Sequence, residues 1–153
     1  MSKALTYAKA IIIPIAVGLV VGLLTSGSMA DFNLLIKPSF SPPGILFPIV
    51  WTILYTLMGI SYGILDSNGL VDSEINRIYY LQLFVNALWS IIFFILNWRF
   101  FAFLWIIFLI VLVVKMIKRF YEKNKTAGLL QIPYLVWLVF AAILNLSIYL
   151  LNR

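Results

Sequence analysis

Five long stretches without a charged side chain divide this chain of 153 residues. They contain 21, 28, 21, 15 and 27 residues and lie between Lys9 and Asp31, Lys37 and Asp66, Arg77 and Arg99, Arg99 and Lys115, and Lys125 and Arg153. A helix needs about 20 residues to cross a lipid bilayer, so four of the stretches are long enough. The fourth stretch reaches the required length because Arg99 and Lys115 can extend their charged groups to the membrane surfaces. The sequence therefore predicts five membrane-spanning helices.

The composition agrees with a membrane protein, because 64% of the residues are apolar and only 10% are charged. A soluble domain has about 45–50% apolar and about 25% charged residues, and it could not hide this excess in one core. Membrane β-strands would alternate apolar and polar side chains over about ten residues, and no such alternation is present. We therefore expect an all-α fold, an integral membrane bundle of five transmembrane helices that forms a single domain over residues 1–153.

Turn signals between the apolar runs place the helices at about residues 8–24, 46–65, 75–96, 100–120 and 127–151. A long loop with the pairs Lys37-Pro38 and Pro42-Pro43 separates the first two helices. The four-residue spacings Gly18/Gly22 and Gly59/Gly63 are typical of close helix packing, either within one subunit or between two.

The first apolar run has a second interpretation, as a secretory signal peptide. Lys3 and Lys9 precede an apolar segment over residues 10–24, and Ser28-Met29-Ala30 resembles a cleavage site. Cleavage there would remove the first helix and its glycine pair.

Basic residues are distributed unevenly between the two ends of the predicted helices. The side with the N terminus and the second and fourth loops carries eight, Lys3, Lys9, Arg77, Lys115, Lys118, Arg119, Lys123 and Lys125, against three on the other side, Lys37, Arg99 and Arg153. Because basic loops stay in the cytoplasm, we expect the N terminus inside and the C terminus outside a bacterial-type cell membrane. The basic residues flank apolar runs, so the net charge of +6 indicates membrane orientation and not nucleic-acid binding.

The residue types exclude several kinds of chemistry. Cysteine and histidine are absent, which removes thiol nucleophiles, imidazole bases and the usual metal ligands, so no metal site and no required cofactor are predicted. All five acids lie at or beyond the predicted helix ends, which disfavours a proton-driven pump.

Aromatic and amide side chains recur at helical spacing within three of the predicted helices. Trp51 begins such a set with Tyr55, Asn86 begins one with Trp89 and Ser90, and Trp137 begins one with Ala141 and Asn145. Spacings of three and four place each set on one helix face, and the amides of Gln82, Asn86 and Asn145 should face the bundle interior. The amides either bond the helices together or line a ligand cavity, and we expect Trp98 and Trp105 at the membrane interface.

Three segments resemble the translocator protein family, also called tryptophan-rich sensory proteins or peripheral benzodiazepine receptors (TspO/MBR). They are Lys37 to Pro43 with Phe47 to Met58, Gln82-Leu83-x-x-Asn86-x-x-Trp89-Ser90-x-x-Phe93-Phe94, and Pro133-Tyr134-Leu135-x-Trp137-x-x-Phe140-Ala141-x-x-Leu144-Asn145. Asp31-Phe32 stands where the family usually has Trp-Tyr, and Phe40 replaces a usual Trp. An indole and a hydroxyl at the cavity entrance are thus missing.

The resemblance implies a five-helix bundle, commonly a homodimer, whose cavity lies under the first loop. That cavity binds porphyrins and isoquinoline or benzodiazepine ligands. Carried over by position, it would be lined by Phe32, Pro42, Phe47, Trp51, Tyr55, Asn86, Trp89, Ser90, Trp137 and Ala141, with Lys37 at the mouth. With no histidine or cysteine to bind iron, metal-free porphyrin should bind about as well as haem.

The leading functional prediction is a membrane receptor or sensor for tetrapyrroles that aids their transport or regulation. One alternative is an enzyme that degrades bound porphyrin with light and oxygen, in which Trp51 and Trp137 would be the catalytic residues. Others are a sterol or lipid transporter and a partner-binding scaffold. A sterol-type motif, Leu146-x-x-Tyr149-x-x-x-Arg153, stands at the C terminus.

Overall fold

The computed structural model describes residues 2–153, and helices cover most of that range. Helices α1 (Lys3–Thr25), α3 (Leu46–Ser67), α4 (Ser73–Ser90), α5 (Arg99–Lys123) and α7 (Ile132–Asn152) are long, and α2 (Met29–Asn33) and α6 (Lys125–Leu129) are short. A single turn of 3-10 helix, Ser26–Ser28, joins α1 to α2, and a π-helical turn, Ile91–Ile95, extends α4. Among residues 2–153, five segments are long and apolar enough to cross a membrane, which confirms the five-helix prediction.

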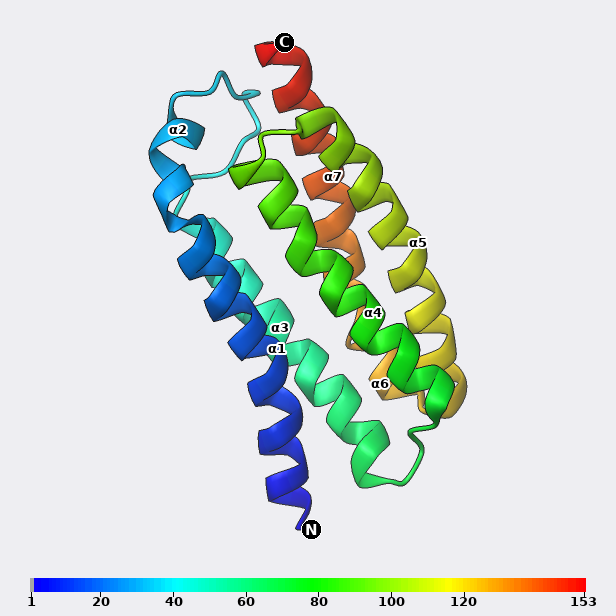
Figure 1. Ribbon diagram of the computed structural model, residues 1–153. Coiled ribbons are helices and arrows are strands. Elements are labelled where there is room, and N and C mark those ends of the chain that lie inside the picture. The colour runs from blue at the N-terminus through cyan, green and yellow to red at the C-terminus, as the bar shows by residue number, and fades with distance from the viewer. Residues whose placement is uncertain (1) are drawn as a thin grey trace.

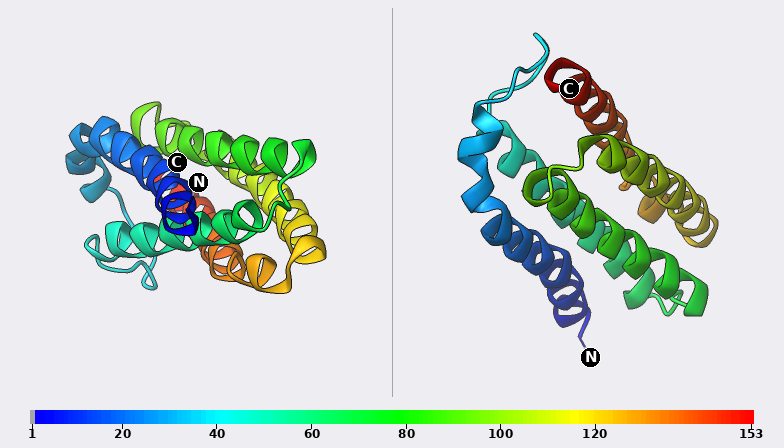
Figure 2. Two further views of the ribbon diagram at one scale, coloured as in Figure 1. Left: turned by 90° about the horizontal axis from the view of Figure 1, so that it is seen from below. Right: turned by 45° about the horizontal axis from the view of Figure 1, so that its top comes forward.

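The helices form one bundle in which α1 lies beside α3, α4 beside α5, and α5 beside α7 (Figure 1 and Figure 2). The N terminus, the turn between α3 and α4, and the junction of α5 with α6 lie at the lower end in Figure 1. The loop at residues 34–45, the turn between α4 and α5, and the C terminus lie at the upper end. We call these the inner and outer ends, after the orientation that the basic residues predict.

The first helical segment is longer than the predicted span at both ends. It begins at Lys3 because the Ser2 side chain accepts a hydrogen bond from the Leu5 amide at 3.2 Å and caps the helix. Beyond residue 24 we expected a turn-rich connection, and the chain instead stays helical almost without interruption to Asn33. The hydroxyls of Thr25 and Ser26 donate to carbonyls one turn back, at 2.9 and 2.8 Å, so they do not end the helix.

The last predicted helix, residues 127–151, is divided into α6 and α7. Asn124 caps α6 by accepting from the Ala127 amide at 3.1 Å, and the chain turns at Leu130 and Gln131. Pro133 lies in the first turn of α7, where its missing N–H is not needed. The sequence contains this start signal, which an apolar count does not register.

Glycines allow α1 and α3 to approach each other closely. A methyl group on Gly59 would overlap the Ile11 backbone, and one on Gly63 would lie 2.7 Å from the Tyr7 ring. On α1, a methyl group on Gly18 would lie 2.6 Å from the Tyr55 ring, whereas at Gly22 it would meet no atom of residues 2–153 within 4 Å. The Gly59/Gly63 pair therefore packs helices within one subunit, and only Gly18 of the other pair does so.

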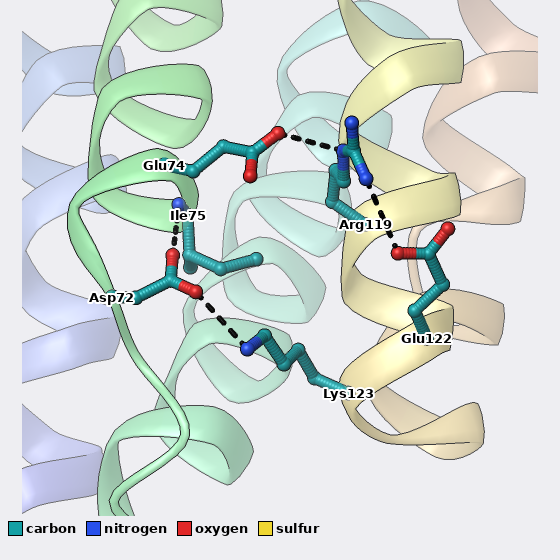
Figure 3. Close-up of polar contacts among 6 residues, drawn as sticks. All are labelled: Asp72, Glu74, Ile75, Arg119, Glu122 and Lys123. Atoms are coloured by element: carbon teal, nitrogen blue, oxygen red, sulfur yellow. Dashed lines mark hydrogen bonds and ion pairs between the residues drawn. The ribbon is translucent and has the colours of Figure 1, made fainter.

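Ion pairs join α4 to α5 at the inner end of the bundle (Figure 3). Lys123 lies 3.0 Å from Asp72, and Arg119 lies 2.7 Å from Glu74 and 3.4 Å from Glu122. Asp72 also caps α4 by accepting from the Ile75 amide at 2.8 Å. This hydrogen bond, followed by the contact with Lys123, lowers the pKa of Asp72 below its ordinary value.

Candidate functional site

A chain of hydrogen bonds joins α3, α4 and α7 in the middle of the bundle. The Tyr55 hydroxyl donates to Asn86 Oδ1 at 3.3 Å, and Asn86 Nδ2 donates to Tyr134 Oη at 2.6 Å. The Tyr134 hydroxyl in turn donates to Gln82 Oε1 at 2.8 Å. All four side chains are buried, and pairing is what buried amides and phenols require where water is excluded. We refer to Tyr55, Asn86, Tyr134 and Gln82 as the polar chain.

Two tryptophans lie near this polar chain: Trp51 of α3 contacts it directly, and Trp137 of α7 lies beside Phe47 of α3. The Trp51 ring centroid lies 5.4 Å from that of Tyr55 and 6.3 Å from that of Tyr134. Trp137 follows Tyr134 by one turn of α7 and contacts Phe47 of α3, with centroids 5.9 Å apart. The two indoles therefore belong to one aromatic wall between α3 and α7.

The indole N–H of Trp137 is unusual, because it is buried and has no hydrogen-bond partner among residues 2–153. Aromatic rings of Phe47 and Phe140 flank the indole at 5.9 and 5.3 Å, and neither offers a strong acceptor. A buried donor of this kind is available to an acceptor on a bound molecule.

Trp89 and Phe32 belong to a second aromatic group, nearer the outer end. The Trp89 indole donates to Asn145 Oδ1 at 3.0 Å, and its ring stacks on Phe93 at 5.3 Å. Phe32 contacts Phe93 and Phe94, at 6.0 and 5.2 Å. Asn86 and Trp89 are one turn apart on α4, so the second group continues the polar chain towards the outer end.

A π-helical turn supplies two rings of this second group. The amide of Leu96 donates to the carbonyl of Ile91 at 3.0 Å, a longer loop than in an α-helix, and Asn97 then takes a positive φ of 59°. Such turns widen a helix and re-aim its side chains. The turn also brings the guanidinium of Arg99 over the Phe93 ring, at 5.3 Å.

The loop at residues 34–45 is fastened to the outer end of α7. Asn152 Oδ1 accepts from the Ile36 amide at 2.9 Å, and Asn152 Nδ2 donates to the Ile36 carbonyl at 2.8 Å. Phe40 contacts Phe140 at 6.3 Å, and Pro42 is half-buried in the same loop. The loop therefore covers the outer end of α7 above Trp137.

Lys37 also lies at the outer end, where the family resemblance places a cavity mouth. Its ammonium group stands 4.8 Å from the Phe32 ring centroid and 3.3 Å from the carbonyl oxygen of Asn33. The group thus caps the end of α2 while resting on Phe32.

Two apolar grooves run along the outside of the bundle beside α7. One, of about 620 Å³, lies between α3 and α7 and is lined by Val50, Ile53, Leu54, Ile132, Pro133, Val136, Trp137 and Phe140. The other, of about 400 Å³, lies between α5 and α7 and is lined by Phe103, Ile107, Ile110, Val139, Ala142, Ile143, Leu146, Ser147 and Leu150. Of the residues predicted to line the ligand cavity, Trp137 is the one that borders either of these two grooves. Within the predicted set, Tyr55 contacts both Trp51 and Asn86, and Phe47 contacts Trp137.

The remaining predicted residues lie on α4, on α7 and at the C terminus. Ser90 is half-buried in the last turn of α4, and Ala141 is buried on α7. In the sterol-type motif, Leu146 borders the α5–α7 groove, Tyr149 contacts Phe100 at 5.3 Å, and Arg153 is exposed.

The site predicted from the sequence did not include Tyr134, which joins two amides of the polar chain. The available signal was its position one turn before Trp137, together with the need of a buried Asn86 for a partner. Trp105, for which we expect a position at the membrane interface, donates its indole N–H to the Val85 carbonyl of α4 at 2.8 Å. Trp98 lies at the turn before α5 and is 57% exposed.

The sequence pattern that defines the TspO/MBR family matches residues 10–151. This chain belongs to the TspO/MBR family. It is 44% identical to the Tryptophan-rich protein TspO of Archaeoglobus fulgidus over 117 residues, which is 76% of each chain. It is also 35% identical to Protein CrtK of Rhodobacter capsulatus over 80% of this chain and 79% of that one, and 32% identical to the Translocator protein homolog of Schizosaccharomyces pombe over 94% and 90%.

Because this chain belongs to the TspO/MBR family and has the five-helix fold, it is an integral membrane protein with a sensor or receptor role. The five spanning helices supply the membrane location. A similar chain from Cereibacter sphaeroides, 31% identical over 119 residues, is itself a Tryptophan-rich sensory protein.

Proposed function

We propose that this TspO/MBR protein is a membrane receptor or sensor that binds a flat tetrapyrrole among the aromatic side chains of α3, α4 and α7. The observation that carries the proposal is the convergence of Trp51, Tyr134 and Asn86, where a buried hydrogen-bonded chain meets an aromatic wall. Aromatic faces suit a planar macrocycle, since each offset-stacked pair contributes about 0.5–1.5 kcal/mol. A few fixed polar groups among apolar walls are typical of small-molecule sites.

A bound macrocycle would replace contacts that these side chains make with one another. The α3–α7 groove beside Trp137 offers a route from the membrane, because its walls are apolar. The unpaired indole N–H of Trp137 would donate to a carboxylate or carbonyl of the ligand. Phe47, Tyr55, Trp89, Ser90 and Ala141 would complete the walls, and the outer segment with Phe32, Lys37 and Pro42 would cover the site.

Porphyrin titration of the purified protein in detergent tests the proposal. We expect saturable shifts of the porphyrin absorbance with protoporphyrin IX and with haem, at similar Kd, because no imidazole or thiolate binds the iron. Trp137→Phe should raise the Kd several-fold, whereas the matched variant Trp98→Phe, at an exposed turn, should not. Non-saturable binding, or strong selectivity for haem, would contradict the proposal.

A second candidate function is the light-dependent oxidative breakdown of bound porphyrin. It is favoured by the two indoles in one aromatic wall, since indole is an oxidisable donor that can react beside a photoexcited porphyrin. Illumination in air should then bleach bound porphyrin to a defined product, and Trp51→Phe and Trp137→Phe should each abolish that product while binding remains measurable. Bleaching that is equal in both variants and in the wild type would rule this function out.

Two other functions, transport and partner-binding scaffolding, would give different experimental outcomes. A tetrapyrrole or sterol transporter would move its ligand across sealed vesicles, and a partner-binding scaffold would bind no porphyrin at all. A sterol or lipid would contact Leu146 in the α5–α7 groove.

We further infer that the end with the N terminus faces the cytoplasm, and that the protein forms a homodimer in the membrane. Eight basic residues at that end against three at the other support the orientation. For the dimer, the exposed Gly22 offers a small residue on the outer surface of α1, while Gly59 and Gly63 are already engaged within the subunit.

A further inference from the structure

Three buried polar atoms near the inner end of the bundle have no hydrogen-bond partner among residues 2–153. They are the hydroxyl oxygen of Tyr79 and both side-chain amide atoms, Nε2 and Oε1, of Gln131. Tyr79 is 1% exposed and Gln131 is 0% exposed, so bulk solvent does not reach either side chain. The polar chain does not include these groups.

The helix register places the two residues in one layer. Helices α4 and α7 run in the same direction along the bundle (Figure 1), and the bond between Gln82 and Tyr134 fixes their relative height. Tyr79 precedes Gln82 by three residues and Gln131 precedes Tyr134 by three, so both lie about one helical turn towards the inner end. Gln131 keeps a near-helical backbone, at φ −90° and ψ −7°, so the register extends to it.

Helix α3 adds a third buried polar group to the same layer. The Met58 sulfur lies 3.9 Å from Gln82 Nε2, and α3 runs opposite to α4, so Ser61 lies one turn further towards the inner end. The Ser61 hydroxyl donates to the Ala127 carbonyl at 2.6 Å, and an acceptor lone pair on its oxygen remains available.

Buried amides and phenols in an apolar bundle need partners, because leaving them unpaired costs their full desolvation energy. A carboxamide offers two donors and two acceptors, and a phenol offers one donor and one acceptor. Buried water forms two to four hydrogen bonds and is found where such groups converge. A layer that contains a carboxamide and a phenol without hydrogen-bond partners among residues 2–153 therefore offers the donors and acceptors that bind a water molecule.

We propose that Tyr79 and Gln131 form a buried water-binding site, one helical turn inward of the bond between Gln82 and Tyr134. Ordered water there bridges the Tyr79 hydroxyl and the Gln131 carboxamide. The site extends the polar interior of the bundle from the polar chain towards the inner end. It is independent of the tetrapyrrole proposal, since it uses none of the residues that would contact that ligand.

Thermal unfolding in detergent of a double-mutant cycle tests the site. If water bridges the pair, Gln131→Met and Tyr79→Phe should each lower the Tm by a few degrees, and together by less than the sum. Tyr80→Phe is the matched control, because Tyr80 is the neighbouring tyrosine and is 41% exposed, and its Tm should not change. A higher Tm for Gln131→Met would show a dry, unsatisfied amide, and strictly additive losses would show that no shared water joins the two residues. Either result would overturn the proposal.

A measurement on the unaltered protein does not depend on how the variants fold. The chain contains two glutamines, Gln82 and Gln131, so labelling with 15N-glutamine gives two side-chain amide signals in an NMR spectrum. We expect a stronger nuclear Overhauser cross-peak to water at Gln131 than at Gln82, whose Oε1 is bonded to Tyr134. Equal or weaker intensity at Gln131 would overturn the proposal.

Discussion

Three buried carboxamides, those of Gln82, Asn86 and Asn145, bond to aromatic side chains from other helices. Asn86 bonds to Tyr55 and Tyr134, and Asn145 accepts from the Trp89 indole. Asn145 also donates to the Arg99 carbonyl at 2.8 Å, at the start of α5. A phenol both donates and accepts, so one Tyr134 hydroxyl can satisfy two amides at once. The same contacts thus fix the helices and arrange the candidate site.

Removing the Tyr134 hydroxyl should destabilise the bundle. Tyr134→Phe keeps the ring but leaves Asn86 Nδ2 and Gln82 Oε1 without their partner, which we expect to cost about 1–2 kcal/mol. Reversible unfolding in mixed micelles measures this difference, and Tyr121→Phe, at an exposed tyrosine, serves as the control. An unchanged free energy of unfolding would mean that the two amides find new partners.

Acid should weaken the inner end through Asp72. Its folded-state pKa lies below the ordinary value of 3.8, because the Ile75 amide and then Lys123 favour the charged form. The stabilisation is therefore fully present above about pH 4 and is lost as the pH falls through the lowered pKa. We expect the Tm to drop over this acid range, and Asp72→Asn to show a shallower drop. High salt should reduce the difference, since the ion pair is exposed.

Elements in this protein begin and end where local hydrogen bonds allow, and membrane length is only one constraint on them. Asp72 and Asn124 cap α4 and α6 through their side chains. Helical structure continues past Thr25 towards Asn33, where an apolar count predicts a loop, because the Thr25 hydroxyl bonds back to the Val21 carbonyl and does not cap the helix end. The π-helical turn at the end of α4 sets the direction of Phe93 and Phe94. A count of apolar residues along the chain does not distinguish this turn from the α-helix before it.

Two glycines on neighbouring helices should respond differently to the same substitution. In Gly59→Ala the new methyl group would meet the Ile11 backbone, so α1 must move away from α3, at a cost of about 1–3 kcal/mol. In Gly22→Ala the methyl group meets nothing within 4 Å among residues 2–153, and alanine favours the helix, so the stability of the single subunit, measured under detergent conditions where the protein is monomeric, should hold or rise slightly. Unfolding midpoints of the two variants in detergent check the contrast. Equal losses would contradict the tight packing at Gly59.

At the scale of the whole molecule, the five membrane-spanning segments of residues 2–153 put the beginning and the end of that range at opposite ends of the bundle (Figure 1). The loop at residues 34–45 and the C terminus share the outer end, where Asn152 ties them together. The ion pairs of Asp72 and Glu74 lie at the inner end with most of the basic residues. Hydrogen bonds of Asn152 thus stabilise the outer end and ion pairs stabilise the inner end, and the aromatic groups lie between the two ends.

Single cysteines can establish the orientation, because the natural sequence contains none. Gly44→Cys lies in the outer loop, and Thr126→Cys lies at the inner end, both at exposed positions. In intact spheroplasts a membrane-impermeant maleimide should label Gly44→Cys and should label Thr126→Cys only after lysis. The opposite pattern would place the N terminus outside.

The fold was largely predictable and the contacts within the site were only partly so. Charge-free lengths give five helices because a bilayer imposes a minimum length on each span. Helical spacing groups Asn86 with Trp89 on one face, and the structure places both side chains in the interior. Spacing within a helix carries no information about partners on other helices, so it did not assign Tyr134 to the site. For the same reason it did not separate Phe32, which contacts Phe93 and Phe94, from Trp51 and Trp137.

The sequence by itself determined that this chain lies in a membrane, that it crosses five times, and that tryptophans and amides occupy one face of three helices. Hydrophobicity and helical period are local properties, and they can be counted along the chain. Only the tertiary structure decided which side chains meet, that Gly59 packs within the subunit, and that Gln131 is left buried without a partner among residues 2–153. Those outcomes depend on the relative height and rotation of neighbouring helices, which are set by packing between segments far apart in the sequence.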